Sequence, residues 1–394
     1  MHISMKKKIL LAAWFALFLG AVSAWAQWGP RSIPEPTDGL KDAYQEYFKI
    51  GVSVNNRNVT DPAQMALILR EFNSITAENA MKPEPTEPRK GEFHWEDADR
   101  IADFCRRNGI RMRGHTLMWH SQIGSWMYQD EKGNLLPKEE FYANMKHHIQ
   151  AIVSRYKDVV YCWDVVNEAF EDNGTLRRSK FYEILGEDFI PLAVQYAHEA
   201  DPTVELYYND YSMNKAQKVD AVVNFFRPLV QKGLPITAIG MQGHLIFEDT
   251  DYVPQYEHAI QAIASLGLKA QFSELDLSAL PNPYGFSGAN VSDRFQYREE
   301  LDPYKNGISA EQQQKIDAFW VDLFTMLMKH KDDVLRVGFW CLNDANSWRN
   351  DFPVKGRTDY ATLFGRDNQP KSTVGKLIDL AAPVSEAPKK SRKK

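Results

Sequence analysis

Residues 161–168 have the sequence YCWDVVNE, a mostly apolar run that ends in an asparagine and a glutamate. Valine and aromatic residues in such a short run are typical of a buried β-strand. Residues 270–274, with the sequence AQFSE, repeat the pattern, because a second apolar run delivers a glutamate to its C-terminal end. If both strands belong to one parallel sheet, the two carboxyl groups lie at the same edge of it.

Six further apolar or β-branched runs accompany these two, and amphipathic stretches separate them. The eight runs cover residues 48–54, 74–77, 111–116, 160–167, 204–209, 237–242, 269–274 and 335–341. Residues 141–156 and 311–330 carry apolar side chains at three- and four-residue spacing, which indicates helices. Alternation of strand and helix predicts a parallel sheet with right-handed crossovers. Eight repeats favour a closed α/β fold, the (β/α)8 TIM barrel, over an open doubly wound sheet.

Polar side chains follow the apolar runs along the whole sequence. Enzymes with a (β/α)8 barrel place their chemistry at the C-terminal ends of the strands. The residues at those positions here are Glu78, Asn79, His115, Asn167, Glu168, Asn209, Asp210, Gln242, His244, Glu274, Asn343 and Asp344. We therefore expect one polar site at this end of the barrel.

The N-terminal 26 residues predict export from the cytoplasm. Three lysines at residues 6–8 precede an apolar run over residues 9–22, and the sequence AWA follows at residues 24–26. This order is typical of a secretory signal peptide, and the run is shorter than the roughly 20 residues that span a membrane. We expect cleavage after Ala26 and a mature protein that is secreted or periplasmic.

The rest of the chain is expected to form one catalytic domain. No linker divides it, so we predict a barrel over residues 27–380 and a basic low-complexity tail over residues 381–394. The longest irregular segment, residues 278–309, is rich in proline and glycine. We expect it to be a long loop over the site.

Composition limits the partners of this chain. Its formal net charge is −5, which argues against binding of nucleic acid or of an anionic membrane. The three cysteines, Cys105, Cys162 and Cys341, are widely spaced, so we expect neither a disulfide scaffold nor a metal site. We read Cys162 and Cys341 as small buried residues. No motif calls for a cofactor, although structural calcium stays open, and we expect a monomer.

The two strand-end glutamates suit the hydrolysis of a glycosidic bond. This reaction needs one carboxylic acid to protonate the leaving oxygen and one carboxylate on the other face of the anomeric carbon. Asp276 follows Glu274 by two residues, and His244 ends the preceding strand. An imidazole between these carboxylates would keep Glu274 ionised, as a nucleophile requires.

Glu168 has no such charged partner nearby in the sequence. Its neighbours in the sequence include the apolar residues Trp163, Ala169 and Phe170. These residues predict a drier setting for the carboxyl group. A dry setting suits an acid catalyst. Either glutamate alone could be a strand-end carboxylate paired with an arginine. The two together, three strand runs apart in one barrel, indicate catalysis.

Six segments of the chain resemble the family 10 glycoside hydrolases, the barrel xylanases. They are TAENAMKPE at 76–84, RGHTLMWH at 113–120, WDVVNEAF at 163–170, GMQGH at 240–244, SELD at 273–276 and FW at 339–340. The similarity continues in order from about Gly51 to Trp348, which covers nearly the whole mature chain. The resemblance implies a retaining endo-β-1,4-xylanase that hydrolyses internal bonds of xylan or xylo-oligosaccharides.

The same resemblance implies roles for single residues. Glu168 matches the acid/base and Glu274 the nucleophile of the family. Asn167 matches an asparagine that binds the sugar 2-hydroxyl at the cleavage point, where Gln242 and His244 also lie. Residues implied to bind the sugars on the non-reducing side are Glu78, Asn79 and Lys82. Residues implied to surround the sugar at the cleavage point are His115, Trp119, Trp340 and Trp348, and Tyr211 is placed on the leaving side.

Two other functions stay open from the sequence. A related retaining β-1,4-glucanase would share the Asn-Glu strand end and the second glutamate. Xylose lacks the hydroxymethyl group of glucose, so a xylanase should crowd that position, and Trp340 and Trp348 are the candidates. The other alternative is a catalytically silent polysaccharide-binding protein. It would have no need of Asn167, Glu168, His244 and Glu274 together.

Overall fold

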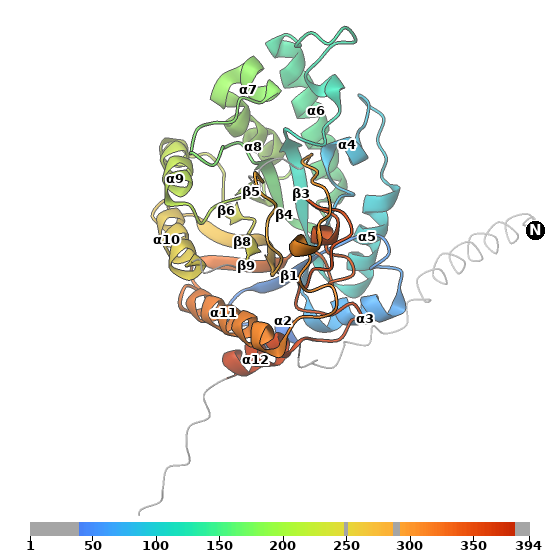
Figure 1. Cartoon of the computed structure of the whole chain (residues 1–394). Coiled ribbons are helices and arrows are strands. Elements are labelled where there is room, and N and C mark those ends of the chain that lie inside the picture. The colour runs from blue at the N-terminus through green and yellow to red at the C-terminus, as the bar shows by residue number, and fades with distance from the viewer. Residues whose placement is uncertain (1–38, 248–250, 287–291, 383–394) are drawn as a thin grey trace, which may run out of the picture. The chain divides into compact units, whose positions relative to one another are not determined.

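The structure, a computed structural model, describes residues 39–247, 251–286 and 292–382. Eight parallel strands form a closed barrel, which confirms the predicted (β/α)8 fold (Figure 1). The strands are β1 (Lys49–Val54), β2 (Ser74–Ala77), β3 (Arg111–Trp119), β4 (Val160–Asn167), β5 (Glu205–Asp210), β6 (Ala238–Met241), β8 (Lys269–Ser278) and β9 (Val334–Phe339). Pairing of β1 with β9 and of β6 with β8 completes the ring. A short strand, β7 (His244–Ile246), adds to β8.

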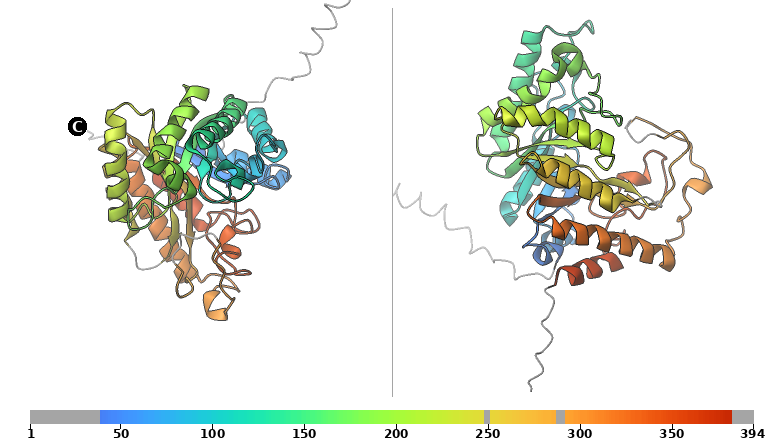
Figure 2. Two further views of the ribbon diagram at one scale, coloured as in Figure 1. Left: turned by 90° about the horizontal axis from the view of Figure 1, so that it is seen from above. Right: turned by 90° about the vertical axis from the view of Figure 1, so that its left-hand side faces the viewer.

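Helices connect the strands and lie outside the barrel, as the two views in Figure 2 show. They are α2 (Leu40–Ala43), α3 (Pro62–Glu71), α4 (Pro83–Thr86), α5 (Glu96–Asn108), α6 (Lys138–Tyr156), α7 (Lys180–Leu185), α8 (Phe189–Ala200), α9 (Ala216–Gln231), α10 (Tyr252–Ala264), α11 (Ala310–Lys329) and α12 (Ser372–Ala381). The helices predicted over residues 141–156 and 311–330 correspond to α6 and α11 and are confirmed.

Local sequence explains where individual helices begin and end. The Asp61 side chain accepts hydrogen bonds from the N–H groups of Ala63 and Gln64, and Pro62 occupies the first turn of α3. Helix α5 ends at Gly109, which adopts a φ of +68° that favours glycine. Such caps satisfy backbone groups that the first and last turns of a helix leave without partners.

Two strands are longer than the sequence indicated. Strand β8 continues past Glu274, because β7 pairs with it from His244 opposite Asp276 to Ile246 opposite Ser278. Strand β3 continues past His115 to Trp119, which lies opposite Asn167 of β4. Residues that were expected at strand ends or in loops are therefore held inside the hydrogen-bonded sheet.

The interior of the barrel contains a buried arginine that explains two glycines. The guanidinium of Arg336 on β9 donates to Ser74 Oγ at 3.0 Å and to Thr76 Oγ1 at 3.2 Å. A Cβ on Gly338 would lie 1.7 Å from Arg336 Nη1, and one on Gly51 would lie 2.2 Å from Nη2. Only glycine at these two positions leaves room for the arginine.

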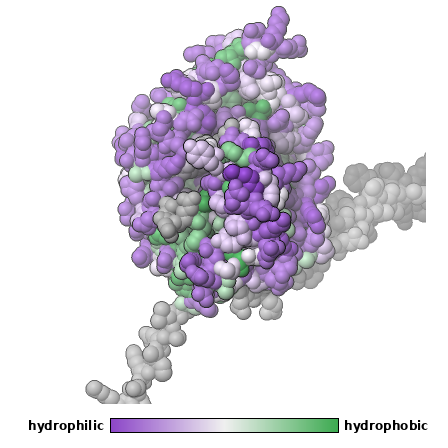
Figure 3. Space-filling view, in the orientation of Figure 1, coloured by the Kyte–Doolittle hydropathy of each residue, from purple (hydrophilic) through white to green (hydrophobic). Residues whose placement is uncertain are grey.

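The remaining sequence expectations concern the cysteines, the membrane and the chain ends. All three cysteines are buried and free, which confirms the buried setting expected for Cys162 and Cys341. Within residues 39–247, 251–286 and 292–382, no helix is long and apolar enough to cross a membrane. The predicted signal peptide, residues 1–26, lies outside the described residues, as does the tail from residue 383 onward. The face in Figure 3 is mainly hydrophilic, with apolar residues in small groups.

Candidate active site

A pocket of about 320 Å³ collects most of the residues singled out from the sequence. Eleven of them line it, namely Lys82, His115, Trp119, Asn167, Glu168, Tyr211, Gln242, His244, Glu274, Trp340 and Trp348. Asp276 is buried behind His244. Glu78 and Asn79 do not line the pocket; Asn79 accepts a hydrogen bond from Lys82, and Glu78 acts on Lys82 electrostatically. The structure therefore brings the two glutamates and their expected partners to one site.

Cationic and polar groups surround Glu274, whose side chain is almost fully buried. Asn209 Nδ2 donates to Glu274 Oε1 at 2.8 Å, and His244 Nε2 lies 3.4 Å from Oε2. Arg113 Nη2 and His115 Nδ1 lie 3.7 Å and 3.9 Å from Oε1. Burial raises the pKa of Glu274, but His115, His244 and Arg113 outweigh burial and hold this pKa well below its usual range. Glu274 is therefore ionised throughout the neutral range.

His244 lies between two carboxylates, as the sequence predicted. Its Nδ1 is 3.0 Å from Asp276 Oδ2, and its Nε2 faces Glu274. Burial lowers the pKa of His244, but Asp276 and Glu274 outweigh burial and raise it to about 9. Asp276 also accepts hydrogen bonds from Trp348 Nε1 at 2.7 Å and from Arg349. The pattern of the sequence gave no reason to single out Arg349.

Glu168 has a different set of partners, all of them neutral. Trp119 Nε1 donates to its Oε2 at 2.9 Å, and Gln242 Nε2 and Asn167 Nδ2 donate to its Oε1 at 2.8 Å and 3.3 Å. The predicted neighbour Trp163 packs elsewhere, with its ring over Gly114 of β3. The hydrogen-bond partners of the Glu168 carboxylate are thus polar and neutral rather than the expected apolar neighbours, and the charged Lys82 and Arg177 act on it only electrostatically.

Backbone geometry also sets Glu168 apart, because its φ is +59°. A left-handed conformation costs a residue with a side chain roughly 1–2 kcal/mol. Surrounding contacts must hold such a residue in place, and residues of this kind cluster at functional sites. Here the sharp turn directly after β4 brings the Glu168 carboxyl group into the pocket.

A chain of amides connects the two glutamates. Asn209 Nδ2 donates both to Glu274 Oε1 and to Asn167 Oδ1, the latter at 2.9 Å. Asn167 in turn contacts Glu168, and Ser273 Oγ donates to Asn209 Oδ1 at 2.6 Å. Asn209 was recognised only as a strand-end polar residue, because a sequence pattern does not indicate which side chains meet across the barrel.

The polar group expected at the non-reducing side is assembled around Lys82. Its Nζ donates to Asn79 Oδ1 at 2.8 Å and lies 5.0 Å and 6.0 Å from the ring centres of Trp119 and Trp340. Burial lowers the pKa of Lys82, against the opposing effects of Glu274, Glu78 and Glu168. The arrangement supplies an ammonium group and two aromatic faces to one side of the pocket.

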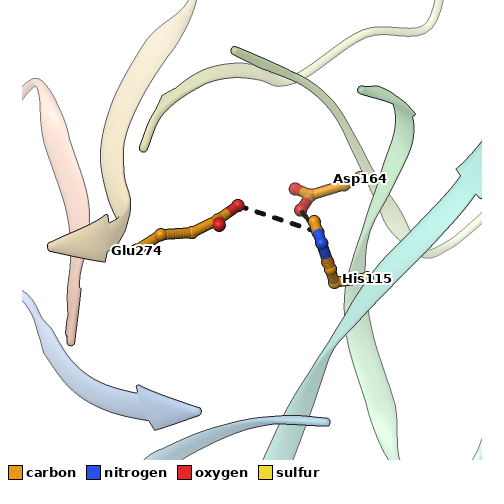
Figure 4. Close-up of side chains that lie close together, drawn as sticks. All are labelled: His115, Asp164 and Glu274. Carbon is orange, nitrogen blue, oxygen red and sulfur yellow. Dashed lines mark hydrogen bonds and ion pairs between the residues drawn. The ribbon is translucent and has the colours of Figure 1, made fainter. Parts of the chain in front are cut away.

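His115, Asp164 and Glu274 are close enough together to raise the question of a metal ion (Figure 4). Their nearest ligand atoms lie within 4.8 Å of one another. However, His115 Nδ1 is already 2.8 Å from Asp164 Oδ2, and the Arg113 guanidinium contacts Asp164 and faces Glu274. A cationic side chain thus already compensates both carboxylates, and these residues fit a hydrogen-bonded support better than a metal site.

The remaining pocket wall contains residues that the sequence did not identify as a group. They are Ser212, Asn214, Lys215, Ile246, Tyr252, Tyr256, Asn282, Phe286, Arg349 and Phe352. Asn282 and Phe286 come from the described part of the long segment after β8, so its expected place beside the site is confirmed. Phe286 packs against Phe352, with ring centres 5.6 Å apart, and Phe352 stacks on Trp348 at 5.1 Å.

A parallel (β/α)8 barrel with two buried glutamates in one pocket at the C-terminal ends of its strands is the arrangement of a glycoside hydrolase. Comparison with known proteins agrees with this class. The model of glycosyl hydrolase family 10 matches residues 39–380, and the chain belongs to this family.

Individual relatives cover nearly the whole domain. The chain is 41% identical to the endo-1,4-beta-xylanase A of Xylanibacter ruminicola over 88% of this chain and 94% of that protein. A GH10 endoxylanase from sugarcane soil metagenome has 40% identity and a TM-score of 0.83, over 87% of this chain and 100% of the other. A psychrophilic family 10 endo-beta-1,4-xylanase has 50% identity and a TM-score of 0.77, over 86% and 98%.

Proposed function

We propose that this family 10 enzyme is a retaining endo-β-1,4-xylanase, with Glu274 as the nucleophile and Glu168 as the acid/base. The observation that carries the proposal is the contrast between the two carboxyl groups of the pocket. The Glu274 carboxylate faces His244 and Arg113, whereas the hydrogen bonds to the Glu168 carboxylate come from the neutral side chains of Trp119, Gln242 and Asn167. A nucleophile must be ionised, and an acid must hold a proton and release it.

The reaction then proceeds in two displacements. Glu274 attacks the anomeric carbon while the bond to the leaving oxygen breaks, and Glu168 transfers its proton to that oxygen. A glycosyl ester on Glu274 results. Glu168, now a carboxylate, takes a proton from water, whose oxygen attacks the same carbon and releases Glu274. Two inversions at one carbon retain its configuration.

The residues around the glutamates suit the sugar at the cleavage point. We assign Asn167 to the 2-hydroxyl group, because its amide group is connected to both glutamates. It donates to Glu168 and accepts from Asn209, which also donates to Glu274. Hydrogen bonds to that hydroxyl strengthen in the transition state. His244, whose pKa Asp276 raises, helps to keep Glu274 ionised before the attack.

Xylan is the proposed substrate because of the pocket wall and the relatives. Trp340 and Trp348 line the pocket next to His244, with ring centres 6.3 Å and 4.8 Å from the imidazole. Bulky rings at this place would crowd the hydroxymethyl group of a glucose unit. The relatives described above are named as xylanases, which supports the same choice.

We also propose that the enzyme acts outside the cytoplasm. The support is the sequence of residues 1–26, with three lysines, an apolar run and a small-residue cleavage signal. The N-terminal residue of protein recovered from the periplasm or the medium of the native host tests this. Gln27 at the N-terminus is expected, and an intact N-terminus on cytoplasmic protein would contradict the proposal.

Product analysis tests the activity itself. The purified protein is incubated with unbranched xylan and, side by side, with carboxymethylcellulose, and the oligosaccharides are separated by chromatography. We expect short xylo-oligosaccharides and little release from cellulose. Preferential release from cellulose would indicate a glucanase. Release from neither polymer would indicate a binding protein.

A further inference from the structure

Three hydrogen bonds hold the main chain at the left-handed turn of Glu168. The Glu168 N–H donates to Asn209 O at 2.9 Å, and the Ala169 N–H donates to the Tyr208 hydroxyl at 3.0 Å. The third bond comes from Arg177, whose Nε donates to the carbonyl oxygen of Glu168 at 3.0 Å. A side chain thus holds the peptide group that follows the proposed acid/base.

Arg177 itself is held at several points. Its backbone N–H donates to Ala169 O at 2.8 Å, and its Nη1 lies 3.2 Å from Glu171 Oε1. Its Nη2 donates to the Tyr211 hydroxyl at 2.7 Å. One planar guanidinium therefore connects the main chain of Glu168 with Tyr211, which lines the pocket.

Two further contacts tie the segment after β4 to the segment after β5. Lys215 Nζ lies 2.5 Å from Asp172 Oδ2, and Gln217 Nε2 donates to Asn173 O at 2.9 Å. Both contacts lie toward the solvent. These two contacts and the contact of Arg177 with Tyr211 thus join the two segments. Of the three, the contact of Arg177 with Tyr211 is the one whose guanidinium also binds Glu168.

We infer that Arg177 is a positioning residue for proton transfer by Glu168, and that it sets the direction of this carboxyl group through the main chain and through Tyr211. The inference rests on the proposed function. Glu168 needs external support because its backbone conformation is unfavourable for a residue with a side chain. Without Arg177 the turn is free to relax, and the carboxyl group moves relative to the leaving oxygen.

The inference has a specific kinetic signature. Protonation matters for a leaving group that is a poor anion, such as a sugar or phenol, and hardly matters for 2,4-dinitrophenol, which departs as a stable anion. Loss of acid catalysis therefore slows hydrolysis of phenyl β-xylobioside and spares the dinitrophenyl compound. A general loss of structure or of substrate binding would slow both.

The test compares Arg177→Met with Arg178→Met. Arg178 is the matched control, because it is the exposed neighbour in the chain and its guanidinium lies over Tyr182, 4.5 Å from the ring centre. The quantity measured is kcat/KM on the two xylobiosides, which reports the steps up to formation of the glycosyl-enzyme. We expect Arg177→Met to lose about tenfold or more on the phenyl compound and less than about twofold on the dinitrophenyl compound, since general acid catalysis contributes about 10²–10⁴.

The variant Tyr211→Phe provides a second measurement that does not depend on how well Arg177→Met folds. It removes the hydroxyl that Arg177 binds, and we expect a smaller loss with the same dependence on the leaving group. Equal losses on both compounds, or no loss for either variant, would overturn the inference. Failure of the proposed function looks different, because the wild-type enzyme would then hydrolyse neither xylobioside.

Discussion

Two N–H groups of Arg349 donate to the same oxygen of Asp276, from Nε at 3.0 Å and from Nη2 at 2.8 Å. The other carboxylate oxygen accepts from Trp348 Nε1 and lies 3.0 Å from His244 Nδ1. Burial raises the pKa of Asp276, but Arg349 and His244 outweigh burial and lower it. The support of the proposed nucleophile therefore extends through His244 and Asp276 to the segment after β9.

Replacement of Arg349 by methionine is expected to destabilise the protein. Asp276 is buried, and removal of one partner of a buried ion pair costs about 3–5 kcal/mol. The free energy of unfolding in urea measures this loss. The control is Arg89→Met, because Arg89 pairs with Glu92 on the exposed surface, where solvent screens the interaction and its loss should hardly change stability. Equal stabilities of the two variants would contradict the prediction.

Stability is expected to decrease as the pH rises through about 9. Because the pKa of His244 is raised to about 9 in the folded protein, against about 6.5 in the unfolded chain, the folded state binds the proton more tightly. The resulting stabilisation is fully present below pH 6.5 and is lost as the pH rises through 9. Its size is about 3 kcal/mol, since one pKa unit corresponds to 1.36 kcal/mol.

Thermal unfolding between pH 6 and pH 10 measures this dependence. His244→Asn should abolish most of it, whereas His94→Asn should not, because the exposed His94 only faces Glu92. A wild-type curve that coincides with that of His244→Asn would exclude the proposed role of His244.

The variants Glu168→Ala and Glu274→Ala are expected to react differently with azide. In Glu168→Ala, azide should attack the glycosyl-enzyme and give a β-glycosyl azide from dinitrophenyl β-xylobioside. In Glu274→Ala, azide should attack the substrate from the vacated face and give an α-azide, with inversion. NMR of the products shows the configuration. Exchanged configurations would mean that the two roles are assigned the wrong way round.

Chelation of metal ions should leave hydrolysis unchanged. The group of His115, Asp164 and Glu274 contains Arg113 in contact with Asp164, so its carboxylates are already compensated. The measurement is the initial rate on xylan after dialysis against EDTA. A rate that falls and returns on addition of calcium would show that a metal ion supports the enzyme elsewhere.

The sequence was sufficient for the barrel and for most of the pocket. Strands were predictable because each is a short apolar run, and Glu168 and Glu274 because each follows such a run. The position of His244 between two carboxylates followed from the order of strands around the barrel. These inferences need only local patterns and the rule that neighbouring strands end at the same edge.

The contacts that the sequence did not indicate mostly join distant segments. Arg349 and Asp276 are 73 positions apart, and Asn209 and Glu274 are 65 positions apart. Arg177 lies close to Glu168 in the sequence, but it binds the backbone carbonyl oxygen of Glu168. Every residue has such an oxygen, so no residue type indicates this contact. An arginine on a segment without periodicity is ordinarily a solvated surface residue, so no pattern distinguished these two arginines from the others.

Glu274 and Asp276 occupy alternate positions on β8, and both belong to its pocket side. Because side chains of a strand alternate between its faces, insertion or deletion of a single residue between them would turn one carboxylate away from His244. A different constraint holds for Gln242 and His244, which flank Gly243 between β6 and β7: the φ of +79° at this glycine sets the direction of both side chains, so a change in length here would also displace them. During divergence, this part of the barrel can therefore accept new side chains but cannot change in length.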